Sequence, residues 1–420
     1  MTHNPIVTEV SDQRDALYHW LTKAGHKNIL AVADENTAPI AASIIKSLST
    51  ARLLTLSPTP GSLDLVPDEV AIGKIFIAAA PYQAKASALI GIGSGTICDL
   101  VRYVSFRLGI PYYIVATAAS MDGYTSTVTA PIVNNLKQTY PATPPAGVLA
   151  ISGIYKNAPS RLTAAGFGDI MGKFTSVTDW EMEGIVEKEA DNFCQDLANE
   201  MRRITEWCFN TKTPTSIMHA LIESGLIMQK CGHSRAAAGS EHHLSHYWEM
   251  SALQEGKPPA LHGAKVGVAT LYVLQAQKWL LDEDITNETW AKAEAKAASF
   301  DEPAWKDEMR NCYANAADEI FELWPDETAA TRLALIKRIR AEWPRLQSIL
   351  CRNTGLGPKV KAAIENMGGP ITPAELGVNR EEFASGVLYA YRLRRRFTTW
   401  RLLDLLGLLP EYAERLAYEI

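Results

Sequence analysis

Residues 86–120 read ASALIGIGSGTICDLVRYVSFRLGIPYYIVATAAS, and this stretch decides the fold. It contains an apolar run, a glycine-rich turn, a helical segment and a second apolar run (Tyr112–Ala116). The apolar runs NILAVAD (28–34) and RLLTLS (52–57) precede it, with a helical pattern between them. Short apolar strands that alternate with helices are typical of a parallel sheet with right-handed crossovers. The sequence therefore predicts an α/β domain around this stretch.

The chain changes character after this stretch. Residues 122–152 are rich in Thr and Pro and contain short β-like runs, among them GVLAIS, which predict an antiparallel excursion. Beyond Pro159, amphipathic helical patterns continue almost to the end of the chain. We therefore expect a Rossmann-like parallel-sheet domain over residues 1–157 and an all-α domain over residues 158–420.

Composition and charge indicate an ordinary globular enzyme. The 420 residues are 47% hydrophobic and 21% charged, and the net charge of −6 argues against a nucleic-acid partner. The dense basic run Arg392–Arg396 is interpreted as a solvated helix face or a subunit contact. No window reaches the roughly 18 apolar residues of a membrane span, and the N-terminus lacks a signal peptide's apolar segment. We expect a cytoplasmic homo-oligomer whose six cysteines are reduced and mostly buried.

Two features of the first half suggest a nucleotide site. In GIGSGT (91–96), three glycines between a strand and a helix let backbone N–H groups approach an anion at a helix N-terminus. The alternative is tight strand-to-helix packing, since the spacing is not G-x-G-x-x-G. Asp34 ends an earlier strand and is the kind of acid that accepts hydrogen bonds from a ribose; a turn or cap is its alternative.

The segment TAASMDGYTS (117–126) follows the carboxyl end of a buried strand, where open α/β sheets place ligands. Its small residues leave room for a cofactor. Asp122 is a candidate contact to a substrate hydroxyl, although Asp122-Gly123 is also an ordinary turn.

Four of the nine histidines fall within residues 234–263, SRAAAGSEHHLSHYWEMSALQEGKPPALHG. On a helix His242 and His246 are one turn apart and share a face, and His262 follows a Pro-Pro loop at the predicted start of another helix. Two helical histidines and one at a helix start make an incomplete metal site that lacks a carboxylate. The alternative is one buried polar histidine and three surface ones, with His243 expected to face away.

The segment AAGFGDIMGKF (164–174) offers the missing carboxylate, Asp169, which also fits a helix N-cap or first-turn acid. Lys173 follows one turn later on the same face. Lys173 and Arg235 are the cations nearest in sequence for an anionic substrate; each equally fits a surface ion pair.

Taken together, GIGSGTICD, PYYIVATAASMDGYTS, GFGDIMGK, SRAAAGSEHHLSH and LHGAKVG stand in the order seen in sn-glycerol-1-phosphate dehydrogenases. The chain resembles this family over nearly its whole length. The family belongs with iron-containing alcohol dehydrogenases, glycerol dehydrogenases and dehydroquinate synthases. Ala236–Ala238 depart from the proline expected after Ser-Arg, and His243 and His246 also satisfy the H-x-x-H spacing of glycerol dehydrogenases.

The resemblance implies a dehydroquinate synthase-like fold and hydride transfer between NAD(P)H and a small phosphorylated polyol, dihydroxyacetone phosphate or sn-glycerol 1-phosphate. It implies one divalent metal (Zn, Ni or Fe) on Asp169, His242 and His262. Asp122, Asp169 and His246 would contact substrate, with Lys173 nearby. The implied NAD contacts, with NADP possible, are Asp34, Gly93, Ser94, Gly95, Thr96, Ile97, Thr117, Ala118, Ala119, Ser120 and Ser126. Glycerol dehydrogenase and a dehydroquinate synthase-like lyase remain alternatives.

Overall fold

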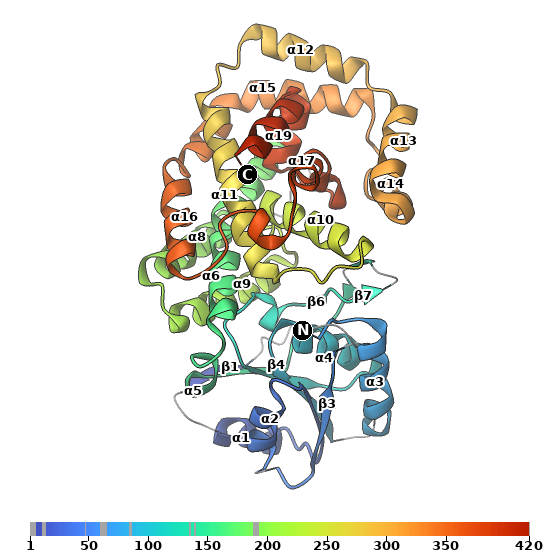
Figure 1. The fold of residues 1–420 in the computed structure, drawn as a ribbon, viewed down its shortest axis with the longest axis vertical. Coiled ribbons are helices and arrows are strands. Elements are labelled where there is room, and N and C mark those ends of the chain that lie inside the picture. The colour runs from blue at the N-terminus through green and yellow to red at the C-terminus, as the bar shows by residue number, and fades with distance from the viewer. Residues whose placement is uncertain are drawn as a thin grey trace. The chain divides into compact units, whose positions relative to one another are not determined.

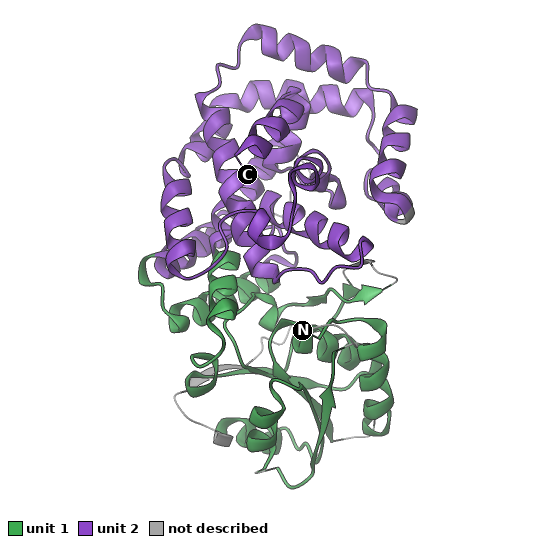
Figure 2. Ribbon diagram, viewed as in Figure 1, with its two compact units in different colours: residues 1–170, 210–230 green, residues 171–209, 231–420 purple. Residues whose placement is uncertain are grey.

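The computed structural model describes residues 6–10, 14–46, 48–58, 65–83, 86–133, 136–137, 140–187 and 193–419. The chain forms two compact units (Figure 2). Unit 1 comprises Met1–Ile170 and Asn210–Lys230, and unit 2 comprises Met171–Phe209 and Cys231–Ile420. Compactness does not say which part binds a cofactor, so the functional domains 1–157 and 158–420 stay a prediction.

Unit 1 is built on a six-stranded sheet with the order β1-β10-β5-β4-β2-β3, in which every neighbouring pair is parallel (Figure 1). The central strands β4, β5 and β10 are buried throughout, as expected when both faces of a parallel sheet are covered. The strands are β1 (Ile6–Val10), β2 (Asn28–Asp34), β3 (Ala51–Leu56), β4 (Ser87–Gly93), β5 (Tyr112–Ala116) and β10 (Gly147–Ile151).

Helices cover this sheet, and their apolar faces form its core. Leu17 of α1 and Ile44 of α2 pack into one buried cluster with the strand residues Ala31, Ile90 and Val115. The helices of this part are α1 (Arg14–Lys23), α2 (Ala38–Ile45), α3 (Glu69–Ala79), α4 (Gly95–Leu108) and α5 (Ser152–Tyr155). The α/β prediction for this half is confirmed.

The predicted antiparallel excursion is partly confirmed. Two short antiparallel pairs follow β5: β6 (Val128–Thr129) with β9 (Tyr140–Pro141), and β7 (Ile132–Val133) with β8 (Leu136–Lys137). The run GVLAIS was wrongly assigned to this excursion, because Gly147–Ile151 form β10 in the parallel sheet and Ser152 begins α5. A continuous apolar run is typical of a parallel strand that is buried on both faces. Here the run is short and its neighbours are rich in Thr and Pro, so the sequence did not show that it belongs to the parallel sheet.

Nearly everything after β10 is helical, as predicted. The helices are α6 (Ser160–Met171), α7 (Lys173–Val186), α8 (Gln195–Thr211), α9 (Pro214–Cys231), α10 (Ser240–Gln254), α11 (His262–Asp282), α12 (Asn287–Ala298), α13 (Glu302–Tyr313), α14 (Ala317–Leu323), α15 (Ala329–Cys351), α16 (Leu356–Asn366), α17 (Arg380–Tyr389), α18 (Thr399–Leu406) and α19 (Leu409–Tyr418). Within unit 2, α10 packs against α7, α11 and α17. Across the described residues, no helix is both long and apolar enough to cross a membrane.

The interpretation of Arg392–Arg396 as a solvated helix face was wrong. Arg392 is only 7% exposed, and its carbonyl accepts a hydrogen bond from the Trp324 indole. Arg396 donates to the Ser234 hydroxyl and to the Ala238 carbonyl, so it holds the segment that leads into α10. Of this run, Arg395 is exposed.

The six cysteines are free, as expected. Only Cys98 and Cys208 are buried, so the expectation of mostly buried thiols was wrong. Cys194, Cys231 and Cys312 are partly exposed, and Cys351 is exposed.

Candidate active site

The predicted nucleotide residues lie at the topological switch point of the sheet in unit 1. The chain leaves β2 through α2 toward β3 on one side, whereas β4 lies on the other side of β2 and leads to β5. The carboxyl ends of β2 and β4, at Asp34 and Gly93, therefore flank the position where open α/β sheets bind ligands.

The glycine-rich turn packs tightly between β4 and α4, and it also leads to a helix N-terminus that lacks a side-chain cap. A Cβ on Gly93 would lie 2.6 Å from the Ile97 side chain, so the tight strand-to-helix packing considered above is present. Ser94 precedes α4 without a side-chain cap to its backbone. The first N–H groups of α4 are thus not satisfied by that hydroxyl and favour an anion.

Asp34 caps a turn. Its Oδ1 accepts hydrogen bonds from the Thr37 backbone N–H and the Thr37 hydroxyl, both at 2.8 Å, just before α2 begins. The turn role considered for this residue is therefore observed, and it places the carboxylate at the switch point in a fixed orientation.

The loop after β5 is held by a buried arginine that sequence reasoning missed. Arg102 of α4 is fully buried and donates to the carbonyls of Gly123 and Val128, the latter at 3.2 Å. Tyr124 donates to the Ala118 carbonyl, and the Thr117 N–H donates to Gly93 at 3.1 Å. A charged residue inside the apolar run LVRYV was the available signal.

Thr117 and Ser120 are buried in this loop, and Ser126, also buried, has its hydroxyl 2.9 Å from the Val128 carbonyl. The predicted cofactor residues that follow β5 (Thr117, Ala118, Ala119, Ser120 and Ser126) thus lie on one loop, whose path is fixed by buried hydrogen bonds.

Asp122, in the same loop, lies beside the other predicted acid. Its N–H donates to Asp169 Oδ2 at 3.1 Å, and its own Oδ2 accepts a hydrogen bond from the Ser224 hydroxyl at 3.0 Å. Both aspartates belong to unit 1. The structure therefore brings together two residues that are far apart in sequence.

Asp169 is fully buried in the last turn of α6. The N-cap alternative for this residue was wrong, because the helix already begins at Ser160. The division between the units falls within this last turn, and Gly172 keeps helical dihedral angles into α7. Asp169 thus lies in the part of α6 that belongs to unit 1.

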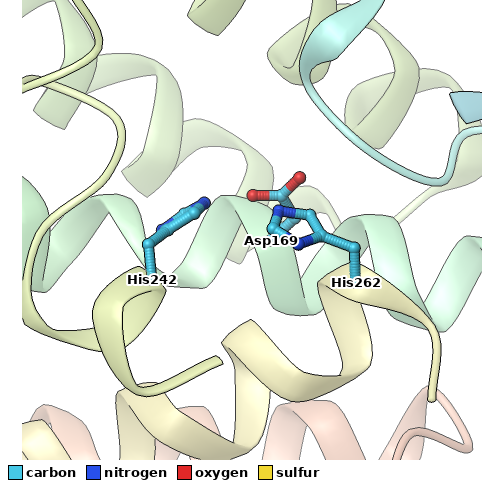
Figure 3. Close-up of side chains that lie close together, drawn as sticks. All are labelled: Asp169, His242 and His262. Carbon is cyan, nitrogen blue, oxygen red and sulfur yellow. The ribbon is translucent and has the colours of Figure 1, made fainter. Parts of the chain in front are cut away.

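Asp169, His242 and His262 offer ligand atoms that all lie within 4.8 Å of one another. Figure 3 shows the three side chains turned toward one another. His242 lies in the first turn of α10, and His262 is the first residue of α11, as its position after the Pro-Pro loop predicted. One carboxylate and two imidazoles suit a divalent transition metal.

Glu241, which sequence reasoning missed, fixes the orientation of His242. Its Oε1 lies 2.8 Å from His242 Nδ1. The same carboxylate accepts hydrogen bonds from the Thr175 hydroxyl at 2.6 Å and from the Gly239 N–H at 2.8 Å. Burial raises the pKa of Glu241, an effect that these hydrogen bonds oppose. A carboxylate on Nδ1 directs Nε2 toward a ligand, as at many metal centres.

His246 lies one turn after His242, as predicted, with its ring centroid 6.1 Å from that of His242 and 5.6 Å from that of His262. Its Nδ1 lies 3.8 Å from Glu249 Oε2, which is 3.0 Å from the Lys265 ammonium. His246, Glu249 and His262 form a second group with ligand atoms within 4.8 Å. His243 belongs to neither group, and burial lowers its pKa well below the ordinary value.

The two predicted cations have other contacts. Lys173 is fully buried, and its ammonium donates to the Ala237 carbonyl at 3.0 Å. Arg235 forms an ion pair with Glu183 at 2.8 Å. The alternative of an ion pair, considered for both, is therefore observed for Arg235.

Known proteins resemble this chain along most of its length. A family model described as iron-containing alcohol dehydrogenase matches residues 11–159. Glycerol-1-phosphate dehydrogenase [NAD(P)+] of Bacillus licheniformis is 30% identical, over 97% of this chain and 92% of the relative. The chain belongs to the glycerol-1-phosphate dehydrogenase family. The enzyme of the same name from Geobacillus thermodenitrificans is 29% identical over 89% of this chain and 85% of the relative.

Solved structures share the fold of this family member. A probable glycerol dehydrogenase from Sinorhizobium meliloti superposes with a TM-score of 0.60 at 16% identity, over 99% of this chain and all of the other (100%). Glycerol dehydrogenase from Schizosaccharomyces pombe gives a TM-score of 0.57 at 16% identity, over 100% of this chain and 92% of the other. At such low identity these structures support the two-part α/β and all-α fold alone.

Membership of the glycerol-1-phosphate dehydrogenase family makes the chain an NAD(P)-dependent oxidoreductase with a metal. The described residues suit both groups: the uncapped start of α4 suits a pyrophosphate, and Asp169, His242 and His262 suit a divalent cation. Which residues hold the two groups stays a prediction.

Proposed function

We propose that this chain reduces dihydroxyacetone phosphate to sn-glycerol 1-phosphate, and catalyses the reverse reaction, with NAD(H) or NADP(H) and one divalent metal. The observation that carries the proposal is the convergence of Asp169, His242 and His262, with Glu241 orienting His242. The printed name of the Bacillus licheniformis relative supports the substrate.

The proposed metal ligands are Asp169, His242 and His262. A divalent metal bound by these residues (zinc, nickel or iron) would supply a Lewis acid for the oxygen of a carbonyl or hydroxyl group. Three protein ligands of mixed carboxylate and imidazole type are characteristic of a catalytic rather than a structural site. Glu241 keeps the His242 imidazole in the tautomer that presents Nε2.

The residues around this set bind and orient the substrate in our proposal. Asp122 accepts a hydrogen bond from a substrate hydroxyl, and the Ser224 hydroxyl at 3.0 Å holds its carboxylate in place. His246 exchanges the proton of the reacting hydroxyl, since an imidazole can gain and lose a proton near neutrality. Lys173, predicted as catalytic, makes its observed hydrogen bond to Ala237, and its charge favours ionised Glu241. We therefore propose that Lys173 is a positioning residue.

For the cofactor, we propose that the pyrophosphate binds at the start of α4, over Gly93, Ser94, Gly95, Thr96 and Ile97. The nicotinamide supplies or accepts the hydride, and the chain holds it along Thr117, Ala118, Ala119, Ser120 and Ser126. Asp34, already oriented by Thr37, accepts hydrogen bonds from the adenosine ribose.

A substrate panel tests the proposal. NADH oxidation by the metal-loaded protein is measured with dihydroxyacetone phosphate and with dihydroxyacetone, and the chirality of the product is determined. We expect kcat/KM to be at least about tenfold larger for dihydroxyacetone phosphate than for dihydroxyacetone. A tenfold difference corresponds to the free energy of about one charge-assisted hydrogen bond to the phosphate group. Equal values for the two substrates would indicate a glycerol dehydrogenase, the alternative that the Arg235–Glu183 pair favours because it neutralises a candidate phosphate ligand.

The same assay addresses the lyase alternative. A dehydroquinate synthase-like enzyme recycles its NAD within each turnover, so stoichiometric NADH consumption contradicts it. The homo-oligomer and the cytoplasmic location stay predictions. Light scattering of the purified chain tests the oligomeric state.

A further inference from the structure

A second set of metal-type ligands lies beside the proposed metal site. His246, Glu249 and His262 offer ligand atoms within 4.8 Å of one another, and His262 is common to both sets. The imidazole ring has two nitrogens, each able to bind a metal, so His262 can serve both positions. Two imidazoles and a carboxylate would hold the same metals as the first set.

A lysine already supplies a positive charge at this second position. Lys265 lies one turn after His262 on α11, and its ammonium is 3.0 Å from Glu249 Oε2. The same oxygen is 3.8 Å from His246 Nδ1. Lys265 is 2% exposed and Glu249 is 6% exposed, so water screens this charge very little.

We propose that Lys265 excludes a metal ion from the position formed by His246, Glu249 and His262. A lysine ammonium is a compact point charge on a flexible stem, and here it forms an ion pair with the carboxylate that a metal would need. A dication at the same place would be repelled by the ammonium and would lose Glu249 as a ligand. The metal therefore stays with Asp169, His242 and His262, and His246 is left for the substrate. The inference rests on the proposed function only in taking those three residues as the metal site.

Metal counting on the full-length chain tests the inference without any substrate. The protein is stripped with a chelator, reloaded with Co²⁺ or Zn²⁺, and its metal content and Co²⁺ absorption spectrum are measured. Wild type and Lys265→Arg, which keeps the charge, should take up a single ion per chain. Lys265→Met should take up an additional ion, with an affinity for it at least about tenfold above that of wild type.

Double variants locate the additional ion. Lys265→Met combined with Glu249→Gln, or with His246→Asn, should lose the additional ion and keep the first. Two ions in wild type, or an unchanged single ion in folded Lys265→Met, would overturn the inference.

A further measurement does not depend on folding of the lysine variant. His246→Asn in the wild-type background should leave the metal dissociation constant unchanged; a rise of about tenfold or more would mean that the metal uses His246 and that the inference is wrong. An inactive protein with the expected metal counts would contradict the proposed function alone. An active enzyme whose Lys265→Met variant takes up no additional ion would contradict this inference alone.

Discussion

The helical unit contains two clusters of buried carboxylates, and they differ in what neutralises them. In the first, Glu327 and Asp404 face Arg332 and Arg401, with N···O distances of 2.7 Å for Arg401–Glu327 and 2.9 Å for Arg332–Asp404. In the second, Glu241 receives its hydrogen bonds from a threonine hydroxyl and a backbone N–H and lies against a histidine ring. We call these the arginine cluster and the histidine cluster.

The pKa directions follow this difference. Burial opposes ionisation of Asp404, but the guanidinium groups of Arg332 and Arg401 lower its pKa below the usual range. Burial raises the pKa of Glu241, where the donors are mainly uncharged. The arginine cluster therefore carries its own counter-charges and stabilises the fold, whereas the histidine cluster is suited to gain a cation from outside.

Removing a proposed metal ligand should have the largest effect. His262→Ala should lose its metal, and turnover should fall by about a thousandfold or more, because several kcal/mol of transition-state stabilisation are lost. The free energy of unfolding of the metal-free protein should change little, since a polar group leaves a polar cluster. Metal analysis, steady-state kinetics and urea unfolding measure the three quantities, and wild-type turnover in this variant would refute the ligand assignment.

Breaking the arginine cluster should have the converse effect. Arg401→Met leaves Glu327 and Asp404 short of a partner and should lower the free energy of unfolding by about 3–5 kcal/mol, without loss of metal from the folded fraction. Arg345→Met is the matched control, because Arg345 is exposed and its pair with Glu342 at 2.9 Å should contribute less than about 1 kcal/mol. Equal losses in the two variants would contradict the structural role of the cluster.

The half of the chain around residues 86–120 could be predicted well because its signals are local. The apolar runs, the glycine-rich turn and the end of the strand at Ala116 can each be recognised from a few consecutive residues. β10 was misassigned because its parallel partners, β1 and β5, are distant in sequence. Local pattern indicates that a strand exists, but not which sheet accepts it.

The candidate site divides in the same way. The one-turn spacing of His242 and His246 and the position of His262 at a helix start were predictable. Glu241, Glu249 and Lys265 were not singled out, because their roles arise where α10, α11 and α7 approach one another. The extreme case is Asp179, which accepts hydrogen bonds from Ser240 and from Thr399, 220 residues away, and so joins the start of α10 to that of α18.

The stability contributions of the buried carboxylates should depend on pH in opposite directions, according to the sign of each pKa shift. The pKa of Asp404 is lower in the folded than in the unfolded chain, where it is about 3.9. Its stabilising contribution is therefore complete above that value and is lost as the pH falls toward the folded-state pKa. Asp179 has the opposite sign: burial raises its pKa to about 7, so its contribution is lost as the pH rises from about 4 to 7.

Urea unfolding at a series of pH values measures this difference. The stability gap between wild type and Asp404→Asn should shrink on acidification, by on the order of 2 kcal/mol. Asp307→Asn is the control: this exposed residue pairs with Arg310, and its gap should stay small and flat. A gap for Asp404→Asn that is independent of pH would contradict the ionic role of the arginine cluster.

The smallest expected effect probes the support of the histidine cluster. Thr175→Val removes the 2.6 Å hydrogen bond to Glu241, and the volume of the side chain at position 175 stays nearly the same. Glu241 then holds the His242 ring less firmly, and the metal dissociation constant should rise by about tenfold, the low end for loss of an outer-shell partner. Thr205→Val is the matched control, because within the described part of the chain this equally buried hydroxyl bonds only to the Met201 carbonyl of its own helix. Both variants should lose about 1 kcal/mol of stability. Weaker metal binding in both to the same degree would mean that Thr175 acts through general stability, and that the histidine cluster differs from the arginine cluster less than the pKa directions imply.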